Sequence, residues 1–263
     1  MSTINSEIIK LRDGKFDVEI MVHGSGDPLV YIHGADGFPA WESYLQTLSE
    51  HYKVYVPAQP GISKSTGLEH LDNIWDLVLF YDELFTKLNL QNIHLIGHSY
   101  GGMIAAEIAS SYPERIKTLT LVSSLGLWNE AEPIKDFFIL TSQERNDLLW
   151  YDNTIPIAVA KYSVPTDPME KASNNINRTI TLASVGKFCW PIPDRGLTKR
   201  IHRLNMPVLL IWGDHDQIVP LSYGHAFNSL INNSKLSVLK NTGHIPQLES
   251  ETEFIKAITE FCK

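Results

Sequence analysis

Ser99 is the strongest candidate nucleophile in this sequence, because it stands in the hexapeptide GHSYGG at the centre of a G-x-S-x-G pattern. A serine hydroxyl is a weak nucleophile at neutral pH and needs a neighbouring base. The pattern alone carries little weight, since a chain of this length contains it by accident roughly one time in ten at average glycine usage. Its flanks add weight: an apolar run at 92–96 predicts a buried strand, and an Ala-rich run at 103–110 predicts a helix. A strand, a tight turn and a helix form a nucleophile elbow.

A simpler interpretation of this segment is a glycine-rich turn that only packs or that binds a phosphate. The dinucleotide pattern G-x-G-x-x-G is absent from the turn, which disfavours a nucleotide site there. A dinucleotide-dependent oxidoreductase would share the alternation of strands and helices described below, but it would need that fingerprint.

His244 is the strongest candidate for the base among ten histidines. It follows a predicted strand at 235–239 and precedes a final helix predicted over 247–261, so a loop presents it at the carboxyl edge of the sheet. Open α/β sheets build their sites at that edge. The other histidines are expected to pack or to be solvated, and His98, next to Ser99, is expected to point elsewhere. The alternative role for His244 is that of a helix-capping or surface residue.

Asp214 and Asp216 both follow an apolar strand predicted over 208–212. A carboxylate that accepts the imidazole N–H would hold the ring in the tautomer and orientation that a base needs. Aspartates after strands commonly cap turns, which is the simpler role for Asp214. We therefore favour Asp216 as the acid. The resulting order along the chain, serine then acid then histidine, is the order that accompanies a nucleophile elbow.

Backbone N–H groups are needed to stabilise the negative charge that forms on a substrate carbonyl during attack, each by about 3 kcal/mol. The amide of Tyr100, directly after the nucleophile and at the start of the following helix, is one expected donor. The second is expected from the loop after a strand predicted at 29–33, where the sequence HGADG makes Ala35 the favoured donor.

The elements that position these residues alternate between strands and helices. Further strands are predicted at 7–11, 16–23, 52–56 and 119–123, and further helices at 41–48, 71–88 and 222–230. This alternation predicts an α/β fold with a mostly parallel central sheet and right-handed crossovers. Strand patterns vanish between 126 and 204, where aromatic residues and prolines scatter. We therefore expect a core domain at 1–125 and 205–263 and a mostly helical cap at 126–204.

Composition narrows the possible partners. The 263 residues carry a net charge of −8 and contain no Lys- or Arg-rich run, which disfavours nucleic acid. No apolar stretch approaches the ~20 residues of a membrane-spanning helix, and the first residues lack a signal-peptide pattern. Two cysteines far apart fit a reducing compartment and give no metal signal. We expect a cytoplasmic monomer or homodimer that acts on a small-molecule substrate without membrane, metal or cofactor.

Together these segments resemble the α/β-hydrolase superfamily over nearly the whole chain. GHSYGG resembles its elbow, HGADG its oxyanion loop, WGDHDQIVP its G-x-x-D acid loop and NTGHIPQLES its histidine loop. PAQPGISKS resembles its P-D-x-P-G-x-G-x-S segment, although Ala58 stands at the usual Asp and Ser63 at the usual second Gly. The resemblance implies a sheet of about eight strands with a helical cap after the sixth. It also selects Asp216 independently as the acid.

The nucleophile separates this chain from dehalogenases and epoxide hydrolases of the superfamily, which place an aspartate at the position of Ser99. Carbon–carbon bond hydrolases that cleave ring-fission diketones are similar in layout and cap length. Many of them, however, carry Asn before the nucleophile and Trp after the histidine, where this chain has His98 and Ile245. Arg178, in the expected cap, fits a clamp for a substrate carboxylate and a surface position equally well.

The function expected from these residues is hydrolysis of a small to medium, largely apolar ester or related acyl compound through an acyl-enzyme. Two alternatives stay open: carbon–carbon bond hydrolysis of a ring-fission diketone, and a weakly hydrolytic ligand receptor on the same fold. The pocket is expected between cap and sheet. Its expected substrate-binding residues are Phe38, Trp128, Trp190 and Ile245.

Overall fold

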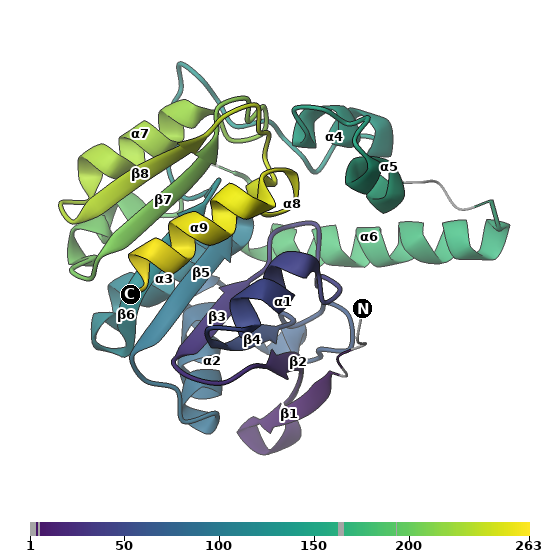
Figure 1. Cartoon of the computed structure of the whole chain (residues 1–263). Helices are drawn as coiled ribbons and strands as arrows, with labels where there is room; N and C mark the ends of the chain where they lie inside the picture. The colour runs from purple at the N-terminus through teal and green to yellow at the C-terminus, as the bar shows by residue number, and fades with distance from the viewer. Residues whose placement is uncertain (1–3, 5, 163–165, 193) are drawn as a thin grey trace.

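A computed structural model describes residues 4, 6–162, 166–192 and 194–263 of the chain. Within these residues one sheet of eight strands forms the centre of the molecule (Figure 1). The strands are β1 (Glu7–Leu11), β2 (Phe16–His23), β3 (Pro28–Ile32), β4 (Lys53–Pro57), β5 (Ile93–His98), β6 (Ile116–Val122), β7 (Val208–Gly213) and β8 (Ser234–Leu239).

The strands lie in the order β1-β2-β4-β3-β5-β6-β7-β8 across the sheet. The pairs β1–β2 and β2–β4 are antiparallel, and every pair from β4–β3 to β7–β8 is parallel. The predicted α/β fold with a mostly parallel sheet of about eight strands is confirmed. Since β5, β7 and β8 run in the same direction, the loops that follow them leave the sheet at one edge.

Helices cover both faces of the sheet, which explains why its central strands are largely buried. All residues of β5 and of β7 are buried, as expected for parallel strands packed on both sides. Helices α1 and α9 pack together in front of the sheet in Figure 1, and α2 and α3 pack together behind it. The core helices are α1 (Ser43–Ser49), α2 (Ile74–Lys87), α3 (Tyr100–Ser111), α7 (Leu221–Leu230), α8 (Pro246–Glu249) and α9 (Glu251–Phe261).

The segment between β6 and β7 contains three further helices in its described part: α4 (Ser142–Leu149), α5 (Pro156–Tyr162) and α6 (Pro168–Cys189). In Figure 1, α6 extends to the right of the sheet at mid-height, and α4 and α5 lie above it. Local signals start two of these helices. Thr141 and Glu144 form a reciprocal capping box at α4, and the Asp167 carboxylate accepts the Glu170 N–H at α6.

The end of the chain differs from the single helix predicted over 247–261. The structure divides this segment into α8 and α9 at Ser250, whose φ of −129° and ψ of 51° are not helical. The interruption follows from the packing of the short α8 next to the loop of His244, while α9 turns away to pack against α1. The apolar pattern continues from one helix into the next, so the sequence alone does not indicate that the helix is interrupted.

Candidate active site

Ser99 lies on a sharp turn between β5 and α3. Its φ of 56° and ψ of −120° place a non-glycine residue in a strained backbone region, as expected for an elbow. Two flanking glycines are required by close packing. A Cβ on Gly97 would lie 2.3 Å from the Gly101 carbonyl oxygen, and a Cβ on Gly101 would lie 2.3 Å from the Ile32 carbonyl oxygen. The turn therefore holds the serine over the first turn of α3, in a conformation that larger neighbours would disrupt.

The three residues expected to form a triad are joined by hydrogen bonds. The Ser99 Oγ lies 2.9 Å from His244 Nε2, and His244 Nδ1 lies 2.8 Å and 3.0 Å from the two carboxylate oxygens of Asp216. The Asp216 Oδ1 also accepts the N–H groups of Ile218 at 3.0 Å and Val219 at 2.8 Å. These donors fix the carboxylate, which in turn orients the imidazole so that Nε2 faces the serine hydroxyl and can accept its proton.

Asp214, the other candidate for the acid, lies outside this chain of hydrogen bonds. Its Oδ1 accepts from His215 Nδ1 at 2.7 Å and from the Thr242 N–H at 3.4 Å. Asp214 therefore links the loop after β7 to the loop that carries His244. The structure brings only Asp216 into contact with His244, whose ring is buried together with the Asp216 carboxylate.

The two expected oxyanion donors belong to segments next to the nucleophile: Tyr100 directly follows Ser99, and a Cβ on Gly34, the residue before Ala35, would lie 3.2 Å from the Cβ of Ser99. Within the described part of the chain, neither the Ala35 N–H nor the Tyr100 N–H donates to a protein acceptor, so both remain able to bind an oxyanion. The loop of Ala35 is fixed by a buried histidine: His33 Nδ1–H donates to the Gly34 carbonyl at 2.9 Å, and His33 Nε2 accepts the Gln59 N–H at 3.3 Å. This network preorganises the loop before any substrate binds.

His98 has a role that the sequence did not predict. It was expected to point elsewhere, but its Nε2–H donates to the carbonyl oxygen of His244 at 2.8 Å, and the two rings lie 5.1 Å apart. Burial, reinforced by the nearby His244, lowers the pKa of His98 to about 4, so the ring is neutral at pH 7. His98 thus connects the elbow to the loop of the candidate base. The only sequence feature that could have indicated this contact is the position of His98 next to Ser99.

The loop of His244 is also attached to the helical insertion. The His244 N–H donates to the carbonyl oxygen of Leu149, the last residue of α4, at 2.8 Å. The Glu249 carboxylate accepts the Gly243 N–H at 2.6 Å through one oxygen and the Tyr151 N–H at 2.7 Å through the other. Glu249 belongs to the segment NTGHIPQLES, whose sequence gave no indication of this bridge. Desolvation raises the pKa of this carboxyl, and the hydrogen bonds oppose that rise.

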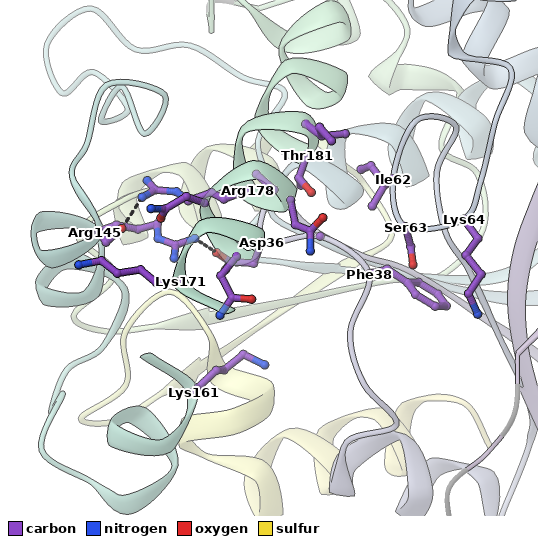
Figure 2. Close-up of a pocket in the computed structure, with 17 residues that line it drawn as sticks. Asp36, Phe38, Ile62, Ser63, Lys64, Arg145, Lys161, Lys171, Arg178 and Thr181 are labelled. Atoms are coloured by element: carbon purple, nitrogen blue, oxygen red, sulfur yellow. Dashed lines mark hydrogen bonds and ion pairs between the residues drawn. The ribbon is translucent and has the colours of Figure 1, made fainter. Parts of the chain in front are cut away.

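A cavity of about 890 Å³ opens beside the loop of Ala35, between this loop and helices α4, α5 and α6 (Figure 2). Most of its lining residues are polar or charged, and the apolar ones are Ala35, Phe38, Ile62 and Ile180. Ser99 and His244 do not line it, and they are only 4% and 3% exposed. The candidate nucleophile is thus covered in this structure, and of the candidate catalytic and oxyanion residues only Ala35 lines the cavity.

The four expected substrate-binding residues are not brought together. Phe38 lines the cavity, whereas Trp128, Trp190 and Ile245 do not. Trp128 packs against the hydrophobic core, and Ile245 is buried within it. Trp190 is half exposed and contacts Phe138 edge-on. The aromatic lining expected from the sequence differs from the polar lining observed, because most aromatic residues of the insertion are used in packing.

The described residues also bear on metal binding and on membrane insertion. They contain no group of three or more His, Cys, Asp or Glu side chains arranged to hold a metal ion. None of their helices combines the length and apolar character needed to cross a membrane. The cytoplasmic location expected from the sequence stays a prediction.

Comparisons with known proteins agree with this geometry. A family model described as the alpha/beta hydrolase fold matches residues 27–251. The chain is 26% identical over 255 residues to a pimeloyl-(acyl-carrier protein) methyl ester esterase of Aliivibrio fischeri, covering 90% of this chain and 94% of that protein. It is 27% identical over 279 residues to 2-hydroxy-6-oxononadienedioate/2-hydroxy-6-oxononatrienedioate hydrolase 1 of Pseudomonas putida, covering 97% and 96% respectively. A solved esterase from Exiguobacterium antarcticum has a TM-score of 0.79 at 20% identity, covering 98% of this chain and 99% of that one.

Proposed function

The chain belongs to the α/β-hydrolase family, and on that premise we propose that it cleaves a carboxylic ester or a related acyl compound through an acyl-enzyme formed on Ser99. The observation that carries the proposal is the continuous hydrogen-bonded path from Ser99 Oγ through His244 to Asp216. Sequence relatives named as esterases support it. Burial of all three residues strengthens their mutual interactions, because little water competes for them.

The geometry supports the following sequence of steps. His244 Nε2 takes the hydroxyl proton as Ser99 Oγ attacks the substrate carbonyl, and the Ala35 and Tyr100 N–H groups bind the developing oxyanion. The protonated His244 then gives its proton to the oxygen of the departing alcohol, which leaves the acyl group on Ser99. A water molecule, deprotonated by the same nitrogen, attacks the acyl carbonyl and restores the serine. Asp216 stays ionised and stabilises the imidazolium in both halves.

The proposal assigns different roles to two parts of the chain. Residues 1–125 and 205–263 form the catalytic core, and residues 126–204 form a helical cap over the carboxyl edge of the sheet. The hydrogen bond from the His244 N–H to the Leu149 carbonyl supports this arrangement, because it attaches the end of α4 directly to the loop of the base. Substrate would enter between the cap and the loop of Ala35, where Phe38 lines the cavity.

Trapping the acyl-enzyme tests the proposal directly. The protein is mixed with p-nitrophenyl butyrate, quenched in acid and digested, and peptides are examined by mass spectrometry for a butyryl group on Ser99. The Ser99→Ala variant is expected to lose both the label and turnover, the latter by several orders of magnitude, with an unchanged melting temperature. Ser229→Ala, which removes an exposed hydroxyl, is the matched control. Full turnover by Ser99→Ala would overturn the proposal, and one round of release without turnover would favour the ligand-receptor alternative.

Carbon–carbon bond hydrolysis is the second candidate. It is favoured by relatives that match nearly the whole chain and are named as hydrolases of 2-hydroxy-6-oxo dienoates, at 23% and 27% identity. The same serine and histidine would serve, with a carbon leaving group in place of an alcohol oxygen. Loss of the visible absorbance of a ring-fission diketone, in the absence of ester turnover, would select this candidate.

A further inference from the structure

The loop of Ala35 contains a tight turn that sets the direction of the candidate oxyanion donor. Ala35 and Asp36 are the two central residues of this turn. The Gly37 N–H closes it by donating to the Gly34 carbonyl at 3.2 Å. The Gly34 end packs against the nucleophile elbow, since a Cβ there would lie 2.9 Å from His98 Nδ1. The Ala35 N–H belongs to the planar peptide unit that begins at Gly34, so a rotation of the turn about this end would change the direction of that N–H.

The opposite side of the turn is attached to the cap. The Asp36 Oδ1 accepts a hydrogen bond from the Arg145 Nη1–H of α4 at 2.8 Å (Figure 2). Within the described part of the chain, the Asp36 carboxylate has no other hydrogen-bond partner. The side chains of Arg145 and Asp36 are 17% and 29% exposed, so salt screens this ion pair less than one on an open surface. The turn is therefore held between the elbow on one side and α4 on the other.

Helix α4 also contacts the loop of the candidate base. Leu149, which follows Arg145 by about one helical turn, accepts the His244 N–H at 2.8 Å through its carbonyl oxygen. This spacing corresponds to about 6 Å along the helix axis. Glu249 adds to the attachment by accepting the Tyr151 N–H at 2.7 Å, just beyond the end of α4. Because a helix moves as a unit, the oxyanion turn and the loop of the base are connected through one short segment of the cap.

We propose that α4 completes the catalytic site when the cap is closed. The ion pair between Arg145 and Asp36 keeps the Ala35 N–H directed at the developing oxyanion, while α4 holds the loop of His244 through the Leu149 carbonyl. Arg145 and Asp36 are positioning residues, because they act on the substrate oxygen only through the backbone of Ala35. The proposal rests on the proposed function, since an oxyanion forms only if a nucleophile attacks a carbonyl.

The burial of the nucleophile gives this arrangement a role in every turnover. Ser99 is 4% exposed, so a substrate needs a movement of the covering segments to reach it. A movement of the cap would break the ion pair between Arg145 and Asp36, and closure would form it again. Closure would thereby restore the direction of the Ala35 N–H in a site from which water is excluded. Stabilisation of the oxyanion then depends on the closed cap.

A double-mutant cycle on the ion pair tests the proposal. Asp36→Asn and Arg145→Gln are each expected to lower kcat for p-nitrophenyl butyrate about tenfold, a part of the roughly 10²- to 10³-fold that the loss of a whole oxyanion donor costs. We expect kcat/KM to fall by the same factor, because the lost interaction is made only in the transition state. The double variant should be no slower than either single variant, since all three remove the same contact. Arg145→Lys keeps the charge and is expected to recover most of the wild-type kcat.

Glu42→Gln is the matched control, because it removes a second ion pair between the cap and the core. Glu42 pairs with Lys161 of α5 at 2.9 Å, and it neither lines the cavity nor belongs to the turn of Ala35. We expect this variant to keep the wild-type kcat and KM. Losses that multiply in the double variant, or an equal loss in Glu42→Gln, would overturn the proposal. A loss confined to KM would also overturn it, because Arg145 lines the cavity and would then act by contacting the substrate.

Hydrogen exchange separates this proposal from the proposed function, because it requires no turnover. Exchange is followed by mass spectrometry in the peptide that contains residues 34–38, where the turn protects the Gly37 N–H. Arg145→Gln and Asp36→Asn are expected to exchange faster there than the wild-type protein, and Glu42→Gln is expected to match it. Faster exchange in the two variants together with absence of any esterase activity would support the link through α4 and refute the ester chemistry. Unchanged exchange and normal turnover in both variants would refute the link and leave the proposed function standing.

Discussion

Acidification from pH 6.5 toward pH 4 is expected to destabilise the folded chain through two buried histidines of the candidate site. His33 and His98 are 2% and 4% exposed, and both hydrogen-bond to backbone groups as neutral rings. Burial lowers the pKa of each to about 4, and at His98 the nearby His244 adds to the effect. In the unfolded chain a histidine has a pKa near 6.5. Between these values the unfolded chain therefore binds protons that the folded chain does not.

The sign and the size of the effect follow from this difference in proton binding. Because the unfolded state binds more protons, the free energy of unfolding rises with pH across this range and falls as the pH is lowered. Each histidine contributes about 1.4 kcal/mol per pH unit, or about 3 kcal/mol over the whole range. This stability is fully present above about pH 6.5. The two histidines together would remove about 6 kcal/mol by pH 4, a large share of the roughly 5–15 kcal/mol typical of a domain.

Urea denaturation, followed by tryptophan fluorescence at several values between about pH 5 and about pH 7, measures this dependence. His98→Asn removes one titrating ring and keeps a short amide donor near the carbonyl of His244. We expect its free energy of unfolding to depend on pH less steeply than that of the wild-type protein, by about 1.4 kcal/mol per unit. His202→Asn, at an exposed histidine, is the matched control and is expected to keep the wild-type slope. Parallel curves for the wild-type protein and His98→Asn would refute the reasoning.

Four further substitutions test other parts of the site. Asp216→Asn is expected to lower kcat for esters about 10⁴-fold, because it removes the acceptor that selects the imidazole tautomer. Asp214→Asn should change kcat only a few-fold, and an equal loss in both would contradict the assignment of the acid. Gly97→Ala is expected to destabilise the fold by about 3 kcal/mol, measured by urea denaturation, because its Cβ would lie 2.3 Å from the carbonyl oxygen of Gly101. Glu249→Gln is expected to lower both the urea midpoint and kcat, since an amide offers one acceptor oxygen where the carboxylate offers two; an unchanged kcat would show that this bridge does not position the base.

The chain of hydrogen bonds from Ser99 to Asp216 could be predicted from the sequence because each member follows a strand with a strong local pattern. Ser99 and His244 are 145 residues apart in the chain, yet β5, β7 and β8 are recognisable as short apolar runs. Parallel strands bring their carboxyl ends to one edge, so the residues directly after them meet. The distinction between Asp214 and Asp216 was also accessible, since a turn-capping role suits the residue nearer to the strand.

The contacts of His98 and the lining of the cavity could not be predicted from the sequence, for a different physical reason. A histidine next to the nucleophile has two ring nitrogens, and which neighbour each one meets depends on the loop after β8, which the local pattern does not position. Aromatic residues present a similar problem. Tryptophan is a residue type expected in a pocket, but it packs equally well elsewhere: Trp128 packs against the core and Trp190 against Phe138.

The cationic cavity shows most clearly what composition cannot predict. Its lysines and arginines come from α4, α5, α6 and the segment after β4, and none of them forms a basic run in the sequence. The net charge of −8 predicts weak binding of polyanions, and that prediction is compatible with a cavity that attracts a small anion. At physiological ionic strength charges are screened over about 8 Å, so a small anion inside the cavity is affected mainly by the charged side chains that line it. A nucleic acid would extend over many such lengths and meet the acidic remainder of the surface. The same chain can therefore repel a polyanion and still attract a small anion toward this cavity, because the two ligands sample its charge over different distances.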